Sequence, residues 1–231
     1  MTEERVSKIG CALLWGSMGM GKTRFALNSP YKPILHIDMH GSARHYFADR
    51  KRLGLDFTWQ LCLTPDKIKA AVETAKKQHW GTIVLDTVEE FCGPLVVHFQ
   101  RIHANKMEKL SELVWGDINN AITARLTELM SHCDMLVMTA DLRNFRGEDQ
   151  PRAKPAAVRL TDVVLRLVRE PNQAIPYALV SRTRLQGLPP RIPQATWPSI
   201  FEYLKNPVDW ANLKPEEMAP EVLFADLEEA A

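Results

Sequence analysis

Residues 16–23, near the N-terminus, have the composition and spacing of a phosphate-binding loop. The spacing G-x-x-x-x-G-K-[ST] lets successive backbone N–H groups point at phosphate oxygens, and the positive end of the following helix adds to the attraction. The lysine of such a loop reaches the β- and γ-phosphates, and the threonine hydroxyl binds Mg²⁺. We therefore expect a nucleoside triphosphate site formed by Gly16, Ser17, Met18, Gly19, Met20, Gly21, Lys22 and Thr23.

A second segment, TIVLDTVEEF at residues 82–91, supplies an acidic partner for this loop. Its apolar run is typical of a buried strand, and the run ends at Asp86. Open α/β sheets bind their ligands at the carboxyl ends of the strands, so this carboxylate is expected beside the phosphates. We predict that Asp86 holds Mg²⁺ through water and that Thr23 is the second protein ligand of the metal.

Hydrolysis also needs a group that activates or positions water. Glu89 and Glu90 follow Asp86 closely, and His40 follows the second predicted strand in LHIDMHGSA. The segment MLVMTAD ends where a nucleotide-sensing strand is expected to end, which makes Thr139 or Asp141 a candidate sensor. The residue types leave these alternatives open.

Apolar, β-prone runs alternate with amphipathic helical stretches along the chain. This order predicts right-handed βαβ units and a mostly parallel central sheet flanked by helices on both faces. Two later strands are too close in sequence for a helical crossover, so we expect an added antiparallel pair. The predicted strands are 9–15, 34–38, 57–62, 82–86, 135–140, 158–168 and 175–181, and the predicted helices are 22–27, 65–78, 89–110, 116–131 and 197–204.

The composition indicates a single globular domain in residues 1–205, followed by an acidic, proline-punctuated tail in residues 206–231. The net charge is +1, so no global field draws the protein to nucleic acid or anionic lipid. The four cysteines form no CxxC pair, and no apolar run approaches the roughly 18 residues that a membrane span requires. We expect a cytoplasmic protein with reduced thiols and no membrane partner.

Five ordered segments resemble those of RecA-like P-loop ATPases, and more closely the compact phage-type versions linked to recombination and single-strand annealing. They lie within residues 8–205 and read GSMGMGKT, HIDMHGSAR, TIVLDTVEEF, MLVMTADLR and LVSRTRLQGLPPRI. The resemblance implies an α/β RecA-like fold, ATP and Mg²⁺ as cofactors, and assembly as a homo-oligomer. Family members often carry Glu where this chain has His40, and phage relatives commonly carry His where it has Asp141.

The resemblance also implies a DNA-binding role for residues 141–157, because the loop after the sensor strand of RecA-like proteins faces DNA. This segment lacks periodicity, and basic residues with an aromatic side chain suit single-stranded DNA, since cations track phosphates while a ring stacks on bases. The expected DNA-binding residues are Arg143, Phe145, Arg146, Arg152 and Lys154.

Arg182 and Arg184, at the end of the last predicted strand, resemble residues that reach the γ-phosphate of a neighbouring subunit. Together with Lys22, Asp86, Glu89 and His40 they complete the expected catalytic set, while Thr139 joins the phosphate-binding loop as a nucleotide contact.

Two other functions fit the same loop. A small-molecule or nucleotide kinase would use an arginine-rich lid over the phosphates. An ATP-dependent loader or regulator would bind a protein partner through the acidic C-terminal tail and hydrolyse ATP slowly. We expect DNA-stimulated ATP hydrolysis first, and we keep these two alternatives.

Overall fold

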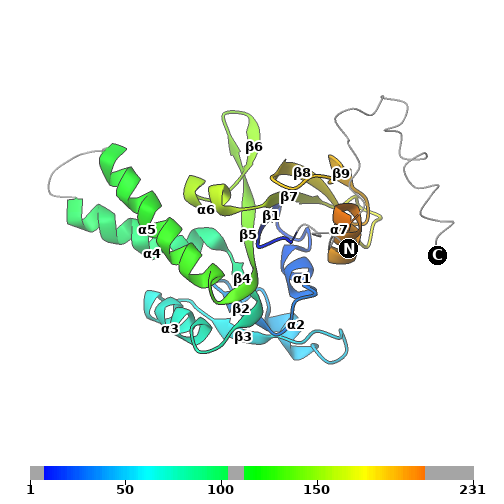
Figure 1. Cartoon of the computed structure of the whole chain (residues 1–231), viewed down its shortest axis with the longest axis horizontal. Helices are drawn as coiled ribbons and strands as arrows, with labels where there is room; N and C mark the ends of the chain where they lie inside the picture. Colours follow the sequence, from blue (N-terminus) through cyan, green and yellow to red (C-terminus); the bar gives the residue numbers. More distant parts are fainter. Residues whose placement is uncertain (1–7, 104–111, 206–231) are drawn as a thin grey trace, which may run out of the picture.

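The computed structural model describes residues 8–103 and 112–205, which fold around one mixed β-sheet (Figure 1). Within these residues the strands are β1 (Cys11–Gly16), β2 (Ile34–Asp38), β3 (Thr58–Leu61), β4 (Trp80–Asp86), β5 (Cys133–Phe145), β6 (Glu148–Pro151), β7 (Val163–Val168), β8 (Tyr177–Thr183) and β9 (Arg191–Ile192). The helices are α1 (Lys22–Leu27), α2 (Arg44–Ala48), α3 (Pro65–Ala75), α4 (Val88–His103), α5 (Glu112–Met130), α6 (Pro155–Leu160) and α7 (Trp197–Lys205).

The strand order is β3-β2-β4-β5-β1-β7-β8-β9, with β6 paired to the outer part of β5. The six strands from β3 to β7 run parallel, whereas β8 and β9 are antiparallel to their neighbours. The predicted fold class is therefore confirmed, including the antiparallel addition. Because the central strands are parallel, their carboxyl ends share one edge of the sheet.

Helices cover both faces of the sheet, because alternate residues of each central strand point to opposite sides. In β1, Cys11 and Leu13 belong to a core that includes buried residues of α3, α4, α5 and α6. Ala12 and Leu14 belong to a second core, which α1 and α7 complete. The strand ends that carry polar side chains are thus held between two packed layers.

Residues 158–168 were predicted to form one strand, and this is wrong in its first part. Residues up to Leu160 belong to α6, and β7 begins only at Val163. Pro155 occupies the first turn of α6, where its fixed φ is pre-organised for a helix. Burial of Ala156 and Ala157 in the core then outweighs the β-propensity of the residues that follow.

Residues 141–157 were predicted to form an irregular loop, and the structure corrects this as well. Strand β5 continues to Phe145 and pairs with Glu148 of β6, so the two strands form a hairpin. Arg146 and Gly147 form its two-residue turn with φ values of 55° and 85°, as a type I′ turn requires. The β5–β6 hairpin stands out from the body of the molecule (Figure 1).

Two further predictions concern the C-terminal tail and membrane-spanning helices. The predicted acidic tail, residues 206–231, lies outside the described residues. Among the helices of residues 8–103 and 112–205, none is long and apolar enough to cross a membrane.

Gly81, the second residue of β4, lies against the backbone of the segment before β2. A Cβ atom at Gly81 would lie 2.4 Å from the Lys32 nitrogen, and backbone cannot move aside as a flexible side chain can. We expect Gly81→Ala to lower the free energy of unfolding by about 1–3 kcal/mol, measured by urea denaturation.

Gly116→Ala is the matched control for this substitution. Gly116 lies within α5, and a Cβ atom there meets no other heavy atom within 4 Å. This variant should gain about 0.5–1 kcal/mol from the helix propensity of alanine. Equal stability of the two variants would contradict the close approach at Gly81.

Candidate nucleotide-binding site

The predicted phosphate-binding loop connects β1 to α1 at the carboxyl edge of the sheet. Gly21 caps α1 with a φ of 87°, a conformation that glycine adopts without strain. Lys22 is buried, and its Nζ atom donates to the carbonyl oxygens of Gly16 (2.9 Å) and Ser17 (3.1 Å). The same Nζ atom lies 2.9 Å from Asp141 Oδ1, so the carboxylate of Asp141 is the anionic partner of Lys22 in this structure.

Asp86, at the end of β4, accepts three hydroxyl hydrogen bonds. Thr23 Oγ1 (2.7 Å) and Ser42 Oγ (2.6 Å) donate to Oδ2, and Thr139 Oγ1 (2.5 Å) donates to Oδ1. Burial alone raises the pKa of Asp86, but His36 and the hydroxyl donors outweigh it and hold the pKa well below its usual range. Asp86 is therefore a buried carboxylate at neutral pH.

The donor set around Asp86 fits Mg²⁺. The Thr23 hydroxyl and the Asp86 carboxylate are adjacent hard oxygen ligands, and Mg²⁺ binds through one or two such groups while it keeps waters and phosphate oxygens. In the described residues, no cluster of three or more His, Cys, Asp or Glu side chains forms a closed metal site. This arrangement fits a metal ion that takes its other ligands from the nucleotide and from water.

The segment after β2 is organised by Asp38, a buried carboxylate that the sequence analysis did not single out. Asp38 Oδ1 accepts the backbone N–H groups of His40 (3.0 Å), Gly41 (2.8 Å) and Ser42 (3.2 Å). These bonds place Ser42 on Asp86 and place His40 at the edge of the cavity. The position of Asp38 at the end of an apolar run is the signal that could have identified it.

His40 and Glu90 form a pair beside the phosphate-binding loop. The His40 Nε2 atom lies 3.4 Å from Glu90 Oε2, and His40 lines the cavity. Glu89 instead forms an ion pair with Arg152, with its Oε2 2.5 Å from the Arg152 Nε atom. Of the predicted water-positioning residues, His40 thus lines the cavity and is paired with Glu90. Glu89 is instead paired with Arg152 at the base of the hairpin.

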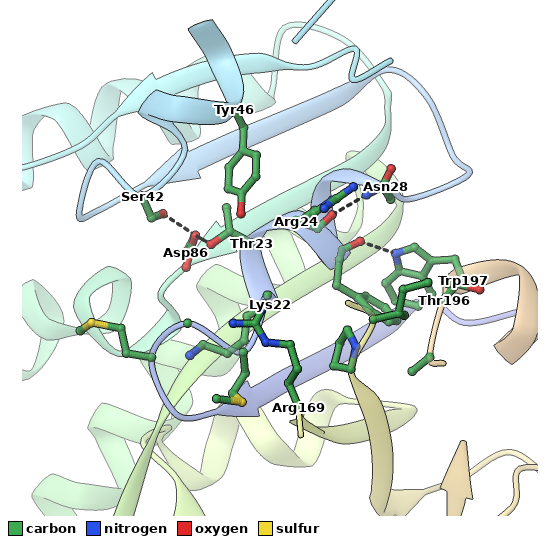
Figure 2. Close-up of a pocket in the computed structure, with 18 of the residues that line it drawn as sticks. Lys22, Thr23, Arg24, Asn28, Ser42, Tyr46, Asp86, Arg169, Thr196 and Trp197 are labelled. Carbon is green, nitrogen blue, oxygen red and sulfur yellow. Dashed lines mark hydrogen bonds between the residues drawn. The ribbon is translucent and has the colours of Figure 1, made fainter. Parts of the chain in front are cut away.

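A cavity of about 940 Å³ opens over the phosphate-binding loop (Figure 2). Tyr46 points into it above Thr23, and Thr196 and Trp197 form another part of its wall. The segment around Pro176 also lines the cavity. Trp197 is fixed by a hydrogen bond from its Nε1 atom to the carbonyl oxygen of Phe25 (2.9 Å). Residues of the cavity that the sequence analysis missed are Arg24, Phe25, Asn28, Ser42, Tyr46, Thr87, Arg169, Ala174, Ile175, Pro176, Ala195, Thr196, Trp197 and Pro198.

The two predicted sensor residues take different places. Thr139 is fully buried behind Asp86, so it can act on the nucleotide only through that carboxylate. Asp141 lines the cavity and binds Lys22. Lys22 can therefore exchange its ion pair with Asp141 for an ion pair with a phosphate group.

The predicted DNA-binding residues divide into two groups. Arg143 and Arg146 lie over the half-exposed Phe145 ring at the hairpin tip, 5.7 and 5.1 Å from its centroid. Arg152 pairs with Glu89 at the hairpin base, and Lys154 lies 5.5 Å from the centroid of the Trp115 ring. Only the first group forms an exposed cationic and aromatic tip.

Arg182 and Arg184 lie at the amino edge of the parallel sheet, away from the phosphate-binding loop of their own chain. Strand β8 is antiparallel to β7, and Arg182 pairs with Val164 near the beginning of β7. The guanidinium groups donate to the carbonyl oxygens of Val158 and Arg159 at the end of α6. Neither side chain can reach the nucleotide of its own chain.

Comparisons with known proteins identify the family and the fold of the chain. The model of a family described as an AAA domain matches residues 10–174, which is more than half of the chain. A crystal structure of the RadB recombinase matches with a TM-score of 0.53 and 18% identity, covering 77% of this chain and 83% of that chain. A KaiC-like protein from Pyrococcus horikoshii OT3 matches with a TM-score of 0.46 and 17% identity, covering 76% and 80% of the two chains. No curated protein matches. The likeness to RadB shows the fold of RecA-like P-loop NTPases.

Proposed function

Since the chain belongs to the AAA domain family, we propose that it is a Mg²⁺-dependent, RecA-like ATPase that acts on single-stranded DNA in recombination or strand annealing. ATP would occupy the cavity over the phosphate-binding loop, with its phosphates on the loop and on Lys22. Mg²⁺ would be held by Thr23 and Asp86 and would neutralise charge on the phosphates. His40, with Glu90 behind it, is the residue best placed to position water.

One observation carries the proposal: β5 joins the nucleotide site to the hairpin tip without a break. Thr139 binds Asp86, Asp141 binds Lys22, and the same strand ends at Phe145. Six residues of strand span about 20 Å. A change at Lys22 can thus be transmitted along one strand to the exposed tip.

The hairpin tip suits single-stranded nucleic acid. Phe145 offers a ring on which a base can stack, and Arg143 and Arg146 supply cations for phosphates. The base of the hairpin is anchored by the ion pair of Arg152 with Glu89, and Arg166 pairs with Asp149 (2.6 Å), which lies opposite Asn144 next to the tip. An anchored base and an exposed tip are what a nucleotide-controlled DNA contact requires.

The same proposal includes a homo-oligomer of the phage-type recombination group in the cytoplasm. Arg182 and Arg184 are exposed at the edge opposite their own nucleotide site, where a neighbouring subunit could receive them. The four cysteines, all buried and unpaired, suit a reducing compartment.

The test is steady-state ATP hydrolysis with Mg²⁺, with and without a long single-stranded DNA, at low and moderate salt. We expect DNA to stimulate hydrolysis, and we expect the stimulation to fade as salt rises, because counterion release weakens phosphate contacts. Phe145→Ala should weaken DNA binding about tenfold, since stacking contributes about 1–3 kcal/mol per base. Ile102→Ala, which removes another exposed apolar side chain, on α4, is the matched control.

Other outcomes would point to the alternatives. Phosphoryl transfer to an added acceptor without a DNA effect would indicate a kinase. Among the described residues of the hairpin, however, Asp141 alone lines the cavity, so the hairpin arginines do not form a lid over the phosphates. Activity that requires a second protein, and is lost when residues 221–231 are removed, would indicate a loader.

A further inference from the structure

Arg169, one of two arginines that line the cavity, lies directly after β7. The end of β7 packs closely on the phosphate-binding loop, since a Cβ atom at Gly16 would lie 2.5 Å from the carbonyl oxygen of Leu167. Arg169 follows two residues later and lines the same cavity as Gly19 and Lys22. Figure 2 shows its side chain extending from the end of β7 toward the loop.

The charge of Arg169 is uncompensated. Among residues 8–103 and 112–205, no carboxylate forms an ion pair with Arg169. The adjacent Glu170 is paired with Arg191, with its Oε1 3.5 Å from the Nη2 atom. Lys22, by contrast, is paired with Asp141 in the same cavity. Arg169 is therefore a cavity cation that an incoming anion meets without having to displace a carboxylate; Arg24, the other arginine that lines the cavity, lies in α1.

We propose that Arg169 binds the phosphate groups of a nucleotide held in the same subunit. A guanidinium presents a planar fork of donors that matches phosphate oxygens, and such charge-assisted bonds are stronger than neutral ones. The proposal rests on the nucleotide-binding part of the proposed function and on no part that concerns DNA. It assigns Arg169 to binding within one chain, whereas Arg182 and Arg184 lie at the opposite edge of the sheet.

The experiment measures dissociation constants by calorimetry, with Mg²⁺ and without DNA, for ATP and for inorganic tripolyphosphate. Arg169→Ala should weaken both ligands by about 10- to 100-fold, the range expected for hydrogen bonds to charged groups. Arg169→Lys should recover part of the loss, because it keeps the charge but not the fork. Arg101→Ala, which removes an exposed guanidinium on α4 outside the cavity, should leave both constants unchanged.

Two results would overturn the assignment. Unchanged constants in Arg169→Ala would show that the side chain makes no contact with the ligand. Weaker ATP binding with unchanged tripolyphosphate binding would place Arg169 on the base or ribose instead. Failure of the unaltered protein to bind ATP would overturn the proposed function as well, whereas absence of DNA stimulation would leave the Arg169 result standing.

Discussion

Replacing Arg184 with alanine is expected to slow ATP hydrolysis by about 10³- to 10⁵-fold while ATP binding is retained, with Arg182→Ala as the alternative if Arg182 is the group delivered. An arginine supplied by a neighbour stabilises charge that develops on the transferred phosphoryl group, so its loss affects turnover and not affinity. The position of both residues at the amino edge of the sheet excludes action on their own nucleotide. Steady-state hydrolysis and nucleotide binding should be measured side by side.

Mixing variants tests whether the arginine acts between subunits. Asp86→Ala removes the carboxylate that faces Thr23 but leaves Arg184 intact, whereas Arg184→Ala does the reverse. A mixed oligomer contains interfaces with one intact nucleotide site and one intact arginine, so activity should return on mixing.

Arg101→Ala removes an exposed arginine near the end of α4 and serves as the control for loss of a surface charge. Full hydrolysis by both Arg182→Ala and Arg184→Ala would show that these arginines only cap the carbonyl oxygens at the end of α6.

Lys22→Ala should lower hydrolysis by at least about 10²- to 10³-fold, the effect of removing one donor from a developing negative charge. The Nζ atom is held by Gly16, Ser17 and Asp141, so the ammonium is already placed at the loop before a phosphate arrives. The substitution also leaves Asp141 without its cation beside the phosphates, which adds repulsion. Hydrolysis and ATP affinity should therefore both fall.

Lys76→Ala is the matched control for this prediction. Lys76 forms exposed pairs with Glu73 and Glu128, outside the cavity. Its removal should change hydrolysis little, because exposed pairs contribute little and lie away from the phosphates. Hydrolysis by Lys22→Ala at the rate of the unaltered protein would place the nucleotide site elsewhere.

Elements with a strong local signal were predicted well. Strand β2 and helix α1 begin and end at the predicted residues, and helix α3 begins at the predicted Pro65, with Thr64 as its cap. Apolar runs of this length and proline at a first helical turn are local properties. The hairpin and α6 were missed, because pairing of β5 with β6 and packing of α6 on the core depend on partners outside the segment.

By itself, the sequence determined the phosphate-binding loop and the identity of Asp86 as its acidic partner. The loop is recognisable because its functional residues lie within eight consecutive positions. Asp86 is recognisable because it is the carboxylate at the end of an apolar strand. Thr23 and Asp86 are 63 positions apart, yet the predicted parallel sheet was sufficient to bring them together.

Only the tertiary structure decided the rest of the site. Ser42, Tyr46 and Arg169 line the cavity from the segment after β2, from α2 and from the segment after β7, and no spacing in the sequence connects them. The order β2-β4-β5-β1-β7 brings them to one edge, because parallel strands place all their carboxyl ends together. Strand β8 reverses direction, and that reversal carries Arg182 and Arg184 to the opposite edge, out of reach of the phosphate-binding loop of their own chain.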